Sequence, residues 1–222
     1  DLIERANIAN KADADLFVSI HCDAFTSPKA FGAGTFVLGL HENERNFKVA
    51  QKENSVIFLE KDYEKNYDGF NPNDPESVIS LILMQQTYLE QSIDVASTIQ
   101  KSFVNNLSRK DRTVKQAGFI VLKYTYMPSV LVETGFLTNA SEGSYLNSKK
   151  GQLNMANAIA KAIINYKKNR AASFEIDAIT STKISKSISK ENQSEVYFKI
   201  QIAASKKKLD LKPFNFKGLK NL

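Results

Sequence analysis

The stretch Pro128-Ser-Val-Leu-Val-Glu-Thr-Gly-Phe-Leu-Thr-Asn139 decides how the rest of the chain is organised. Its three successive apolar residues, 130–132, indicate a short strand that is covered on both faces. Glu133 follows where this strand is expected to end. Ligands of open parallel sheets gather at the carboxyl ends of strands, so Glu133 is a candidate site residue. The alternative is a cap or loop carboxylate paired with a nearby lysine, and this stretch alone leaves both open.

A second apolar run ends in the same way, with a histidine at its tip. Residues 16–20 (Leu-Phe-Val-Ser-Ile) predict a strand, and His21 follows it directly. A lone histidine serves either in a structural hydrogen bond or as a metal ligand. Because parallel strands bring their carboxyl ends to one edge of a sheet, we expect His21 and Glu133 to lie on the same edge.

The remaining elements alternate between strands and helices. His41 precedes an expected helix cap at Asn43 and is interpreted as a turn or capping residue, with a ligand role as the alternative. This alternation predicts an α/β domain with a mostly parallel sheet flanked by helices. The expected strands are residues 35–38 and 118–122; the expected helices are 2–12, 43–60, 74–108, a short one from 141 or 142, and 152–168, with a long surface loop at 61–75.

The composition is that of a globular protein whose positive charge lies near the end of the chain. Of the net charge of +6 over 222 residues, residues 171–222 contribute ten lysines against five acidic residues. A lysine-rich tail without an aromatic-basic motif does not predict nucleic-acid binding. No apolar run is long enough for a transmembrane segment. No signal peptide is present in this chain, which we expect to begin inside a longer protein. Cys22 is the only cysteine, so an intramolecular disulfide is excluded.

Three regions are expected along the chain. Residues 1–170 form the α/β domain, residues 171–194 a flexible Ser/Lys-rich linker, and residues 195–222 a partial α+β tail. Within the tail, residues 196–202 alternate like a strand, but too few residues follow to build an independent core.

Three strings together resemble the zinc-dependent N-acetylmuramoyl-L-alanine amidases, which cut peptidoglycan. They are Arg5-Ala-Asn-Ile-Ala-Asn10 leading into Ala14-Asp-Leu-Phe-Val-Ser-Ile-His-Cys-Asp-Ala24, then Gly118-Phe-Ile-Val-Leu122 with the opening stretch from Met127, and the Asn157-Ala-Ile-Ala-Lys-Ala-Ile163 helix. The resemblance covers residues 1 to about 169. It implies hydrolysis of the amide bond between N-acetylmuramic acid and L-alanine, with Zn²⁺ as the cofactor and peptidoglycan as the substrate.

The resemblance also assigns roles to residues. His21 matches the later of two zinc-binding histidines, and Glu133 matches the catalytic glutamate, which handles protons. Asp23 stands where the family usually has Asn. The family's first His and its Glu ligand are expected upstream of Asp1. The alternative function is therefore a non-catalytic peptidoglycan-binding or structural fragment, because two expected ligands lie outside this chain.

Two further expectations come from the resemblance. Residues 53–91 lie where some family members carry a regulatory insertion that covers the zinc, and Glu60 and Glu64 are the candidate blocking carboxylates, which an activator protein would displace. The alternative is a solvated lid. Residues 195–205 resemble the opening strand of a sporulation-related repeat domain, which binds glycan strands. These features imply a periplasmic or cell-envelope location.

Overall fold

The computed structural model describes residues 1–39, 44–67, 69–71, 74 and 86–188, with side chains described up to residue 171. The chain divides into two compact units, Asp1–Ser173 and Phe174–Leu222. His41 and Asn43, residues 75–85 of the helix expected at 74–108, and the tail from residue 195 lie outside the described residues. Within the described part, no helix is both long and apolar enough to cross a membrane.

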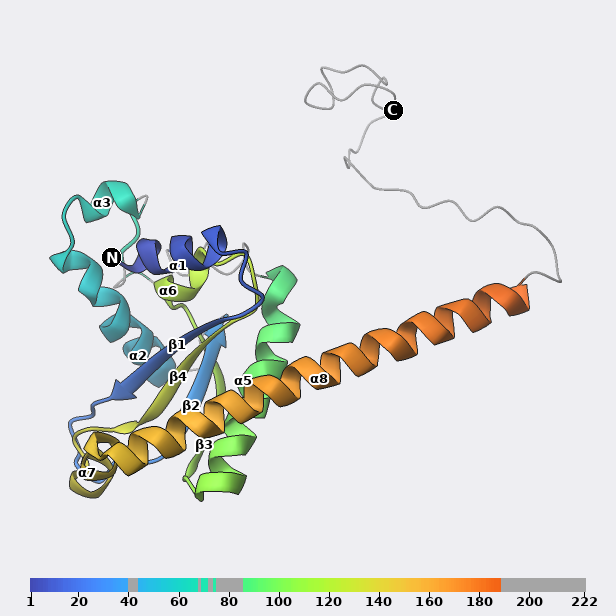
Figure 1. The fold of residues 1–222 in the computed structure, drawn as a ribbon. Coiled ribbons are helices and arrows are strands. Elements are labelled where there is room, and N and C mark those ends of the chain that lie inside the picture. The colour runs from blue at the N-terminus through green and yellow to red at the C-terminus, as the bar shows by residue number, and fades with distance from the viewer. Residues whose placement is uncertain (40–43, 68, 72–73, 75–85, 189–222) are drawn as a thin grey trace, which may run out of the picture. The chain divides into compact units, whose positions relative to one another are not determined.

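A four-stranded mixed sheet forms the centre of the first unit (Figure 1). Its strands lie in the order β1-β4-β2-β3, and two of the three pairings, β1 with β4 and β2 with β3, are parallel. The pairing of β2 with β4 is antiparallel. The expected α/β fold with a mostly parallel sheet is thus confirmed, with one antiparallel junction at its centre. The strands are β1 Phe17–Asp23, β2 Ala33–Leu38, β3 Asp111–Ala117 and β4 Ser129–Phe136.

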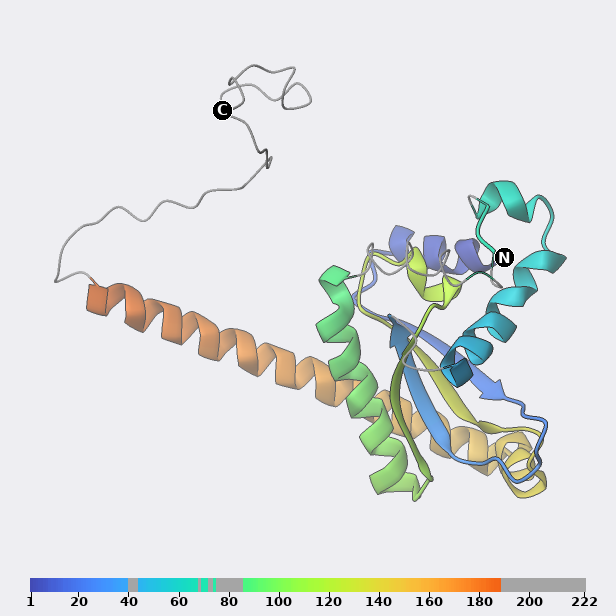
Figure 2. The same ribbon diagram turned by 180° about the vertical axis from the view of Figure 1, so that it is seen from behind.

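Helices cover both faces of the sheet, so the two central strands are buried along their whole length. In β4, Leu131 packs with α1, α2 and α6, whereas Val130 and Val132 pack with α5 and α8. Figures 1 and 2 show α1 beside α6 from opposite directions. The helices are α1 Leu2–Lys11, α2 Glu44–Asn54, α3 Tyr63–Asn66, α5 Leu89–Leu107, α6 Ile120–Lys123, α7 Ala140–Asn147 and α8 Lys149–Ile188, with the 3₁₀ helices η1 Ser55–Leu59 and η2 Gln86–Tyr88.

The strand predicted at residues 118–122 is wrong. Residues Ile120–Lys123 form the short helix α6, and the strand in this part of the chain is β3, which precedes it. A short apolar run fits a buried strand and a buried helix equally well, and these residues are buried against α1 and the core. The buried Asn54 side chain accepts a hydrogen bond from the Ile120 amide at 2.9 Å and so caps the start of α6.

Several expected boundaries also shift. β4 continues to Phe136, so Glu133 lies inside the strand and not at its end. The predicted loop 61–75 contains the short helix α3. Helix α8 continues to Ile188, although the sequence predicted an end near residue 168 and a linker from 171. Within α8 no proline occurs, and no glycine follows Gly151, so the sequence contains no strong helix breaker there.

Candidate metal centre

The pairing of β1 with β4 brings His21 and Glu133 together. The two strands run parallel, and His21 is the register partner of Glu133. Alternate residues of a strand share a face, so Ser19 and His21 lie on the same face of β1 as Phe17, which packs against the cluster around α1, α2 and α6. Glu133 shares a face with Leu131 in that same cluster. The expected juxtaposition of His21 and Glu133 follows from this register.

Both nitrogens of the His21 ring have a polar neighbour. Nε2 lies 2.8 Å from Ser19 Oγ, and Nδ1 lies 3.0 Å from Glu53 Oε2. The side chain of His21 is 19% exposed and that of Glu53 is 26% exposed, so this pair is largely shielded from solvent. Ser19 therefore orients the ring through Nε2 and leaves Nδ1 directed at the carboxylates, the arrangement by which ligand histidines are commonly fixed.

Glu53 reaches the site because the end of α2 is fixed on both sides of it. The Nζ of Lys52 donates a hydrogen bond to the Ala24 carbonyl at 3.1 Å. The side-chain Nδ2 of Asn54 donates a hydrogen bond to the Gly118 carbonyl at 2.7 Å, while the Oδ1 of the same side chain caps α6. These contacts fix the last turn of α2 against the loop after β1 and against the segment between β3 and α6, so the position of Glu53 depends on contacts outside α2.

Glu133 is buried without a hydrogen-bond partner for either carboxylate oxygen among the described residues. Burial, together with the negative charges of Asp23 and Glu53, raises the pKa of Glu133 to about 8. The pKa of Glu53 is lowered, chiefly by its hydrogen bond with His21. Burial also raises the pKa of Asp23, against a hydrogen bond from the Ala24 amide. A buried, unpaired carboxylate is costly unless it is neutral or meets a cation.

The donor atoms of His21, Glu53 and Glu133 lie within 4.8 Å of one another, which makes them a group that can hold a metal ion. One imidazole nitrogen with carboxylate oxygens is a donor set that suits zinc and similar divalent ions. The unpartnered oxygens of Glu133 strengthen this fit because a cation would compensate the buried charge. The residues present therefore fit a divalent metal.

The structure does not bring the other two predicted carboxylates to this group. Glu60 accepts hydrogen bonds from the Leu2 amide at 3.1 Å and from the buried Tyr67 hydroxyl at 2.6 Å. Glu64 is exposed and accepts a hydrogen bond from Tyr63. The carboxylate beside His21 is Glu53, which the sequence did not single out. The signal available in the sequence was its position three residues after Ala50, because this spacing places Glu53 on the same face of the helix as the buried Ala50.

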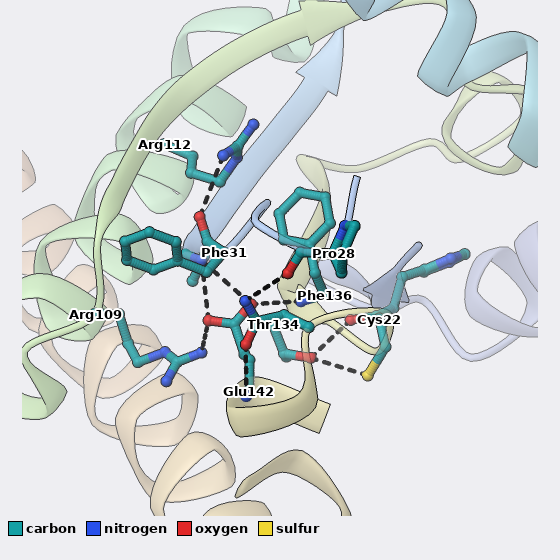
Figure 3. Close-up of polar contacts among 12 residues, drawn as sticks. Cys22, Pro28, Phe31, Arg109, Arg112, Thr134, Phe136 and Glu142 are labelled. Carbon is teal, nitrogen blue, oxygen red and sulfur yellow. Dashed lines mark hydrogen bonds and ion pairs between the residues drawn. The ribbon is translucent and has the colours of Figure 1, made fainter. Parts of the chain in front are cut away.

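A second cluster of polar contacts fixes the backbone next to the site (Figure 3). The buried Glu142 carboxylate accepts hydrogen bonds from the amides of Gly32 at 2.9 Å and Phe136 at 2.6 Å, and it pairs with Arg109. Thr134 donates to the His21 carbonyl at 2.8 Å. These contacts join the loop after β1 to the end of β4, next to His21 and Glu133.

A histidine and two carboxylates gathered over one end of an α/β sheet form a group that can hold a metal ion, the kind of site that metal-dependent hydrolases use. The chain belongs to the N-acetylmuramoyl-L-alanine amidase family, whose model matches residues 1–165. The resemblance stated from the three sequence strings is therefore confirmed at the level of the family.

Curated relatives agree with this assignment. The chain is 34% identical over 168 residues to the N-acetylmuramoyl-L-alanine amidase AmiA of Salmonella typhimurium, and the match covers 74% of this chain and 56% of AmiA. It is 33% identical over 165 residues to LytC, an amidase of Bacillus subtilis, covering 74% of this chain and 24% of LytC. The chain thus spans about half the length of AmiA. A solved amidase from Clostridium difficile 630 shares the fold, with a TM-score of 0.51 and 24% identity over 76% of this chain and 66% of that chain.

Proposed function

We propose that the protein hydrolyses the amide bond between N-acetylmuramic acid and the L-alanine of the peptidoglycan stem peptide. The observation that carries this proposal is the buried carboxylate of Glu133, unpartnered in the described structure and in register with His21. Membership of the amidase family supports the reaction type. Amide hydrolysis needs a base for the attacking water and an acid for the leaving amine, and one carboxylate can serve as both.

In this proposal the metal is zinc, and His21 would hold it through Nδ1 while Ser19 fixes the ring through Nε2. When bound, zinc would supply a Lewis acid that polarises the scissile carbonyl and makes the attacking water more acidic. Glu53 is the second donor in the arrangement described here, but this proposal does not require it as a ligand of the active site, because the family resemblance assigns a further His and a Glu ligand to residues outside this sequence.

Glu133 takes a proton from the attacking water and passes it to the departing amine of L-alanine. Burial suits this role because a carboxylate with a raised pKa is a stronger base and, once protonated, a usable acid near neutral pH. Burial also keeps bulk water away from the carboxylate, so the proton is exchanged with the reacting groups.

Replacing Glu133 by Gln in the full-length protein tests this role. We expect loss of muropeptide cleavage, by at least about 100-fold, because the amide cannot accept the proton. Bound zinc, measured by atomic absorption, is expected to stay within twofold of wild type, because in this proposal Glu133 handles protons and is not a zinc ligand. Glu64→Gln, an exposed glutamate, is the matched control and should cleave normally. Retained turnover in the Glu133→Gln protein would rule out the base role.

We further propose that the end of α2 regulates access to the metal, with Glu53 as the blocking carboxylate in place of Glu60 and Glu64. Its hydrogen bond to His21 Nδ1 supports this, since it occupies the nitrogen that faces the site. An activator protein that moves α2 would break this contact. Glu53→Ala is expected to raise the basal cleavage rate of the full-length protein several-fold. A lower rate would instead make Glu53 a required ligand and contradict the blocking role.

The non-catalytic alternative is not favoured, because the chain belongs to a family of hydrolases. We place the protein in the cell envelope, where its substrate is found, and a periplasmic location belongs to the same proposal. The domain boundaries at 170 and 194 and the glycan-binding role of residues 195–222 also stay proposals.

A further inference from the structure

A groove of about 350 Å³ lies between helix α5 and strand β3. Figure 2 shows α5 running alongside β3, the strand at the opposite end of the sheet order from β1. The metal-binding group lies instead on β1, α2 and β4, so the groove is a separate site. Its lining side chains are Ser97, Gln100, Lys101, Val104 and Asn105 of α5 and Asp111, Thr113 and Val114 of β3.

The shape of the groove suits an extended chain. The lining residues of α5 recur every three or four positions between 97 and 105, so they form one side of the helix over about 12 Å. A strand rises about 3.3 Å per residue, so this length accommodates about four residues of an extended peptide.

Strand β3 offers such a peptide a free edge. It is the last strand in the sheet order, and within the described ranges only β2 pairs with it. Residues 114–117 pair regularly with residues 35–38 of β2, so this part of β3 has ordinary strand geometry. The outer edge of such a strand presents backbone N–H and C=O groups that a further strand can pair with.

The one acidic side chain of the groove is already engaged. The Asp111 carboxylate accepts hydrogen bonds from the Thr113 amide at 2.7 Å and from the buried Gln100 side chain at 2.6 Å. These contacts fix a bulge at the start of β3, where the register shifts and Thr113 has a positive φ. A bulge disrupts pairing, so the free edge is limited to the residues that follow it.

The charge of the groove comes from Lys101, which is exposed and has no hydrogen bond or ion pair with any residue that the structure describes. Val104 and Val114 beside it are half-buried and can contact apolar side chains. Pairing of β3 with β3 of a second copy would bring the cations Lys101 and Lys115 of both copies close together. Like charges facing each other across strands are destabilising, so an acidic partner is favoured over a second copy.

We propose that the groove between α5 and β3 binds an extended, acidic peptide segment of a partner protein, which adds to the edge of β3 as a further strand. On the side facing α5, the apolar residues of this segment contact Val104 and Val114, and an acidic residue pairs with Lys101. The inference is independent of the proposed function, because it concerns neither the metal nor the peptidoglycan.

Binding of a capped hexapeptide to the full-length protein tests this proposal. In the probe, valine, glutamate and valine alternate with threonine, so that the first three share one face of a strand. A second probe has lysine in place of glutamate, and a third has N-methylated amides that cannot donate hydrogen bonds. By fluorescence anisotropy, we expect the second and third probes to bind at least about tenfold more weakly than the first. Amide hydrogen exchange at residues 114–117 should slow when the first probe binds.

A charge swap identifies the contact. In the Lys101→Glu protein, the glutamate probe should bind about tenfold more weakly and the lysine probe about tenfold more tightly than they bind wild type. Glu is a good helix former and Lys101 is exposed, so the melting temperature should stay the same. Lys161→Glu, at an exposed position of α8 outside the groove, is the matched control, because it changes the net charge equally and should change neither affinity.

The inference would be overturned by equal effects of the two substitutions, by equal binding of the N-methylated probe, by unchanged exchange at residues 114–117, or by no binding of the glutamate probe. Self-association of the wild-type protein that Lys101→Glu abolishes would overturn it in favour of a second copy. Both substituted proteins should cleave muropeptides like wild type, so this inference and the proposed function fail separately.

Discussion

At the scale of single residues, the site depends on which face of a strand each side chain occupies. Glu133 and Leu131 share a face of β4, and their burial places a charged group beside apolar core residues. The cost of that burial is seen in the raised pKa of Glu133. Such a cost in stability is common where a carboxylate acts near neutral pH, the role that we propose for Glu133.

The raised pKa predicts a pH-dependent stability in the metal-free protein. Folded Glu133, with a pKa of about 8, holds its proton where the unfolded carboxyl, with a pKa of 4.5, has lost it. The folded state therefore loses stability as the pH rises from 4.5 to 8, on the order of 4 kcal/mol. Thermal denaturation with a chelator present should show a melting temperature that falls over this range in wild type and falls less in Glu133→Gln. Parallel curves for the two proteins would contradict the buried, protonated carboxyl.

We predict that Ser19 affects zinc affinity by orienting the ring of His21, and not by stabilising the fold. Ser19→Ala removes the group that holds Nε2, and loss of such an orienting partner commonly lowers metal affinity 10- to 100-fold. Competitive zinc titration of the full-length protein measures this. Ser27→Ala, in the loop after β1, is the control and should bind zinc normally. An unchanged affinity in Ser19→Ala would show that the ring is held by other contacts.

The sequence was sufficient to predict that His21 and Glu133 lie together, and insufficient to predict the contacts of Ser19 and Glu53 with His21. The first two follow apolar runs whose strands were predictable from composition. Glu53 reaches the site only through the packing of α2, fixed by Lys52 and Asn54, and such contacts between elements have no local pattern. Glu60 shows the same limit, since its carboxylate accepts hydrogen bonds from the Leu2 amide and the Tyr67 hydroxyl, which lie far apart from each other in sequence.

At the scale of elements, β3 and α6 show where pattern reading fails. β3 has the sequence Asp-Arg-Thr-Val-Lys-Gln-Ala, in which polar residues dominate, and Thr113 adopts a positive φ of 64°. Its strand state is imposed by pairing with β2. The apolar sequence of α6 predicts a strand, but these residues form a helical turn. That turn depends on a cap from Asn54, more than 60 residues away in sequence.

Asn54 is therefore predicted to be a major contributor to stability. It is 2% exposed, and Asn54→Ala would leave the Gly118 carbonyl and the Ile120 amide without their partner. We expect a loss of about 2–3 kcal/mol in the free energy of unfolding, measured by urea denaturation. Asn66→Ala, at an exposed asparagine of α3, should change it by less than about 1 kcal/mol. Equal effects would mean that the cap contributes little.

At the scale of the whole molecule, the order β1-β4-β2-β3 explains why distant segments form one site. The pairing of β1 with β4 joins residues more than 100 positions apart, and the Glu142 cluster ties the loop after β1 to the end of β4. Strand alternation predicted the fold class, but the antiparallel junction of β2 with β4 could not be read from strand patterns that look alike in either direction.

Product analysis is the direct test of amide hydrolysis between N-acetylmuramic acid and L-alanine. The full-length protein with Glu53→Ala is incubated with purified peptidoglycan and zinc, and the soluble products are analysed by mass spectrometry and by labelling of free amines. We expect stem peptides with a free L-alanine amino terminus and glycan strands of unchanged length. New sugar reducing ends, cleavage within the stem peptide, or no released peptide would contradict it.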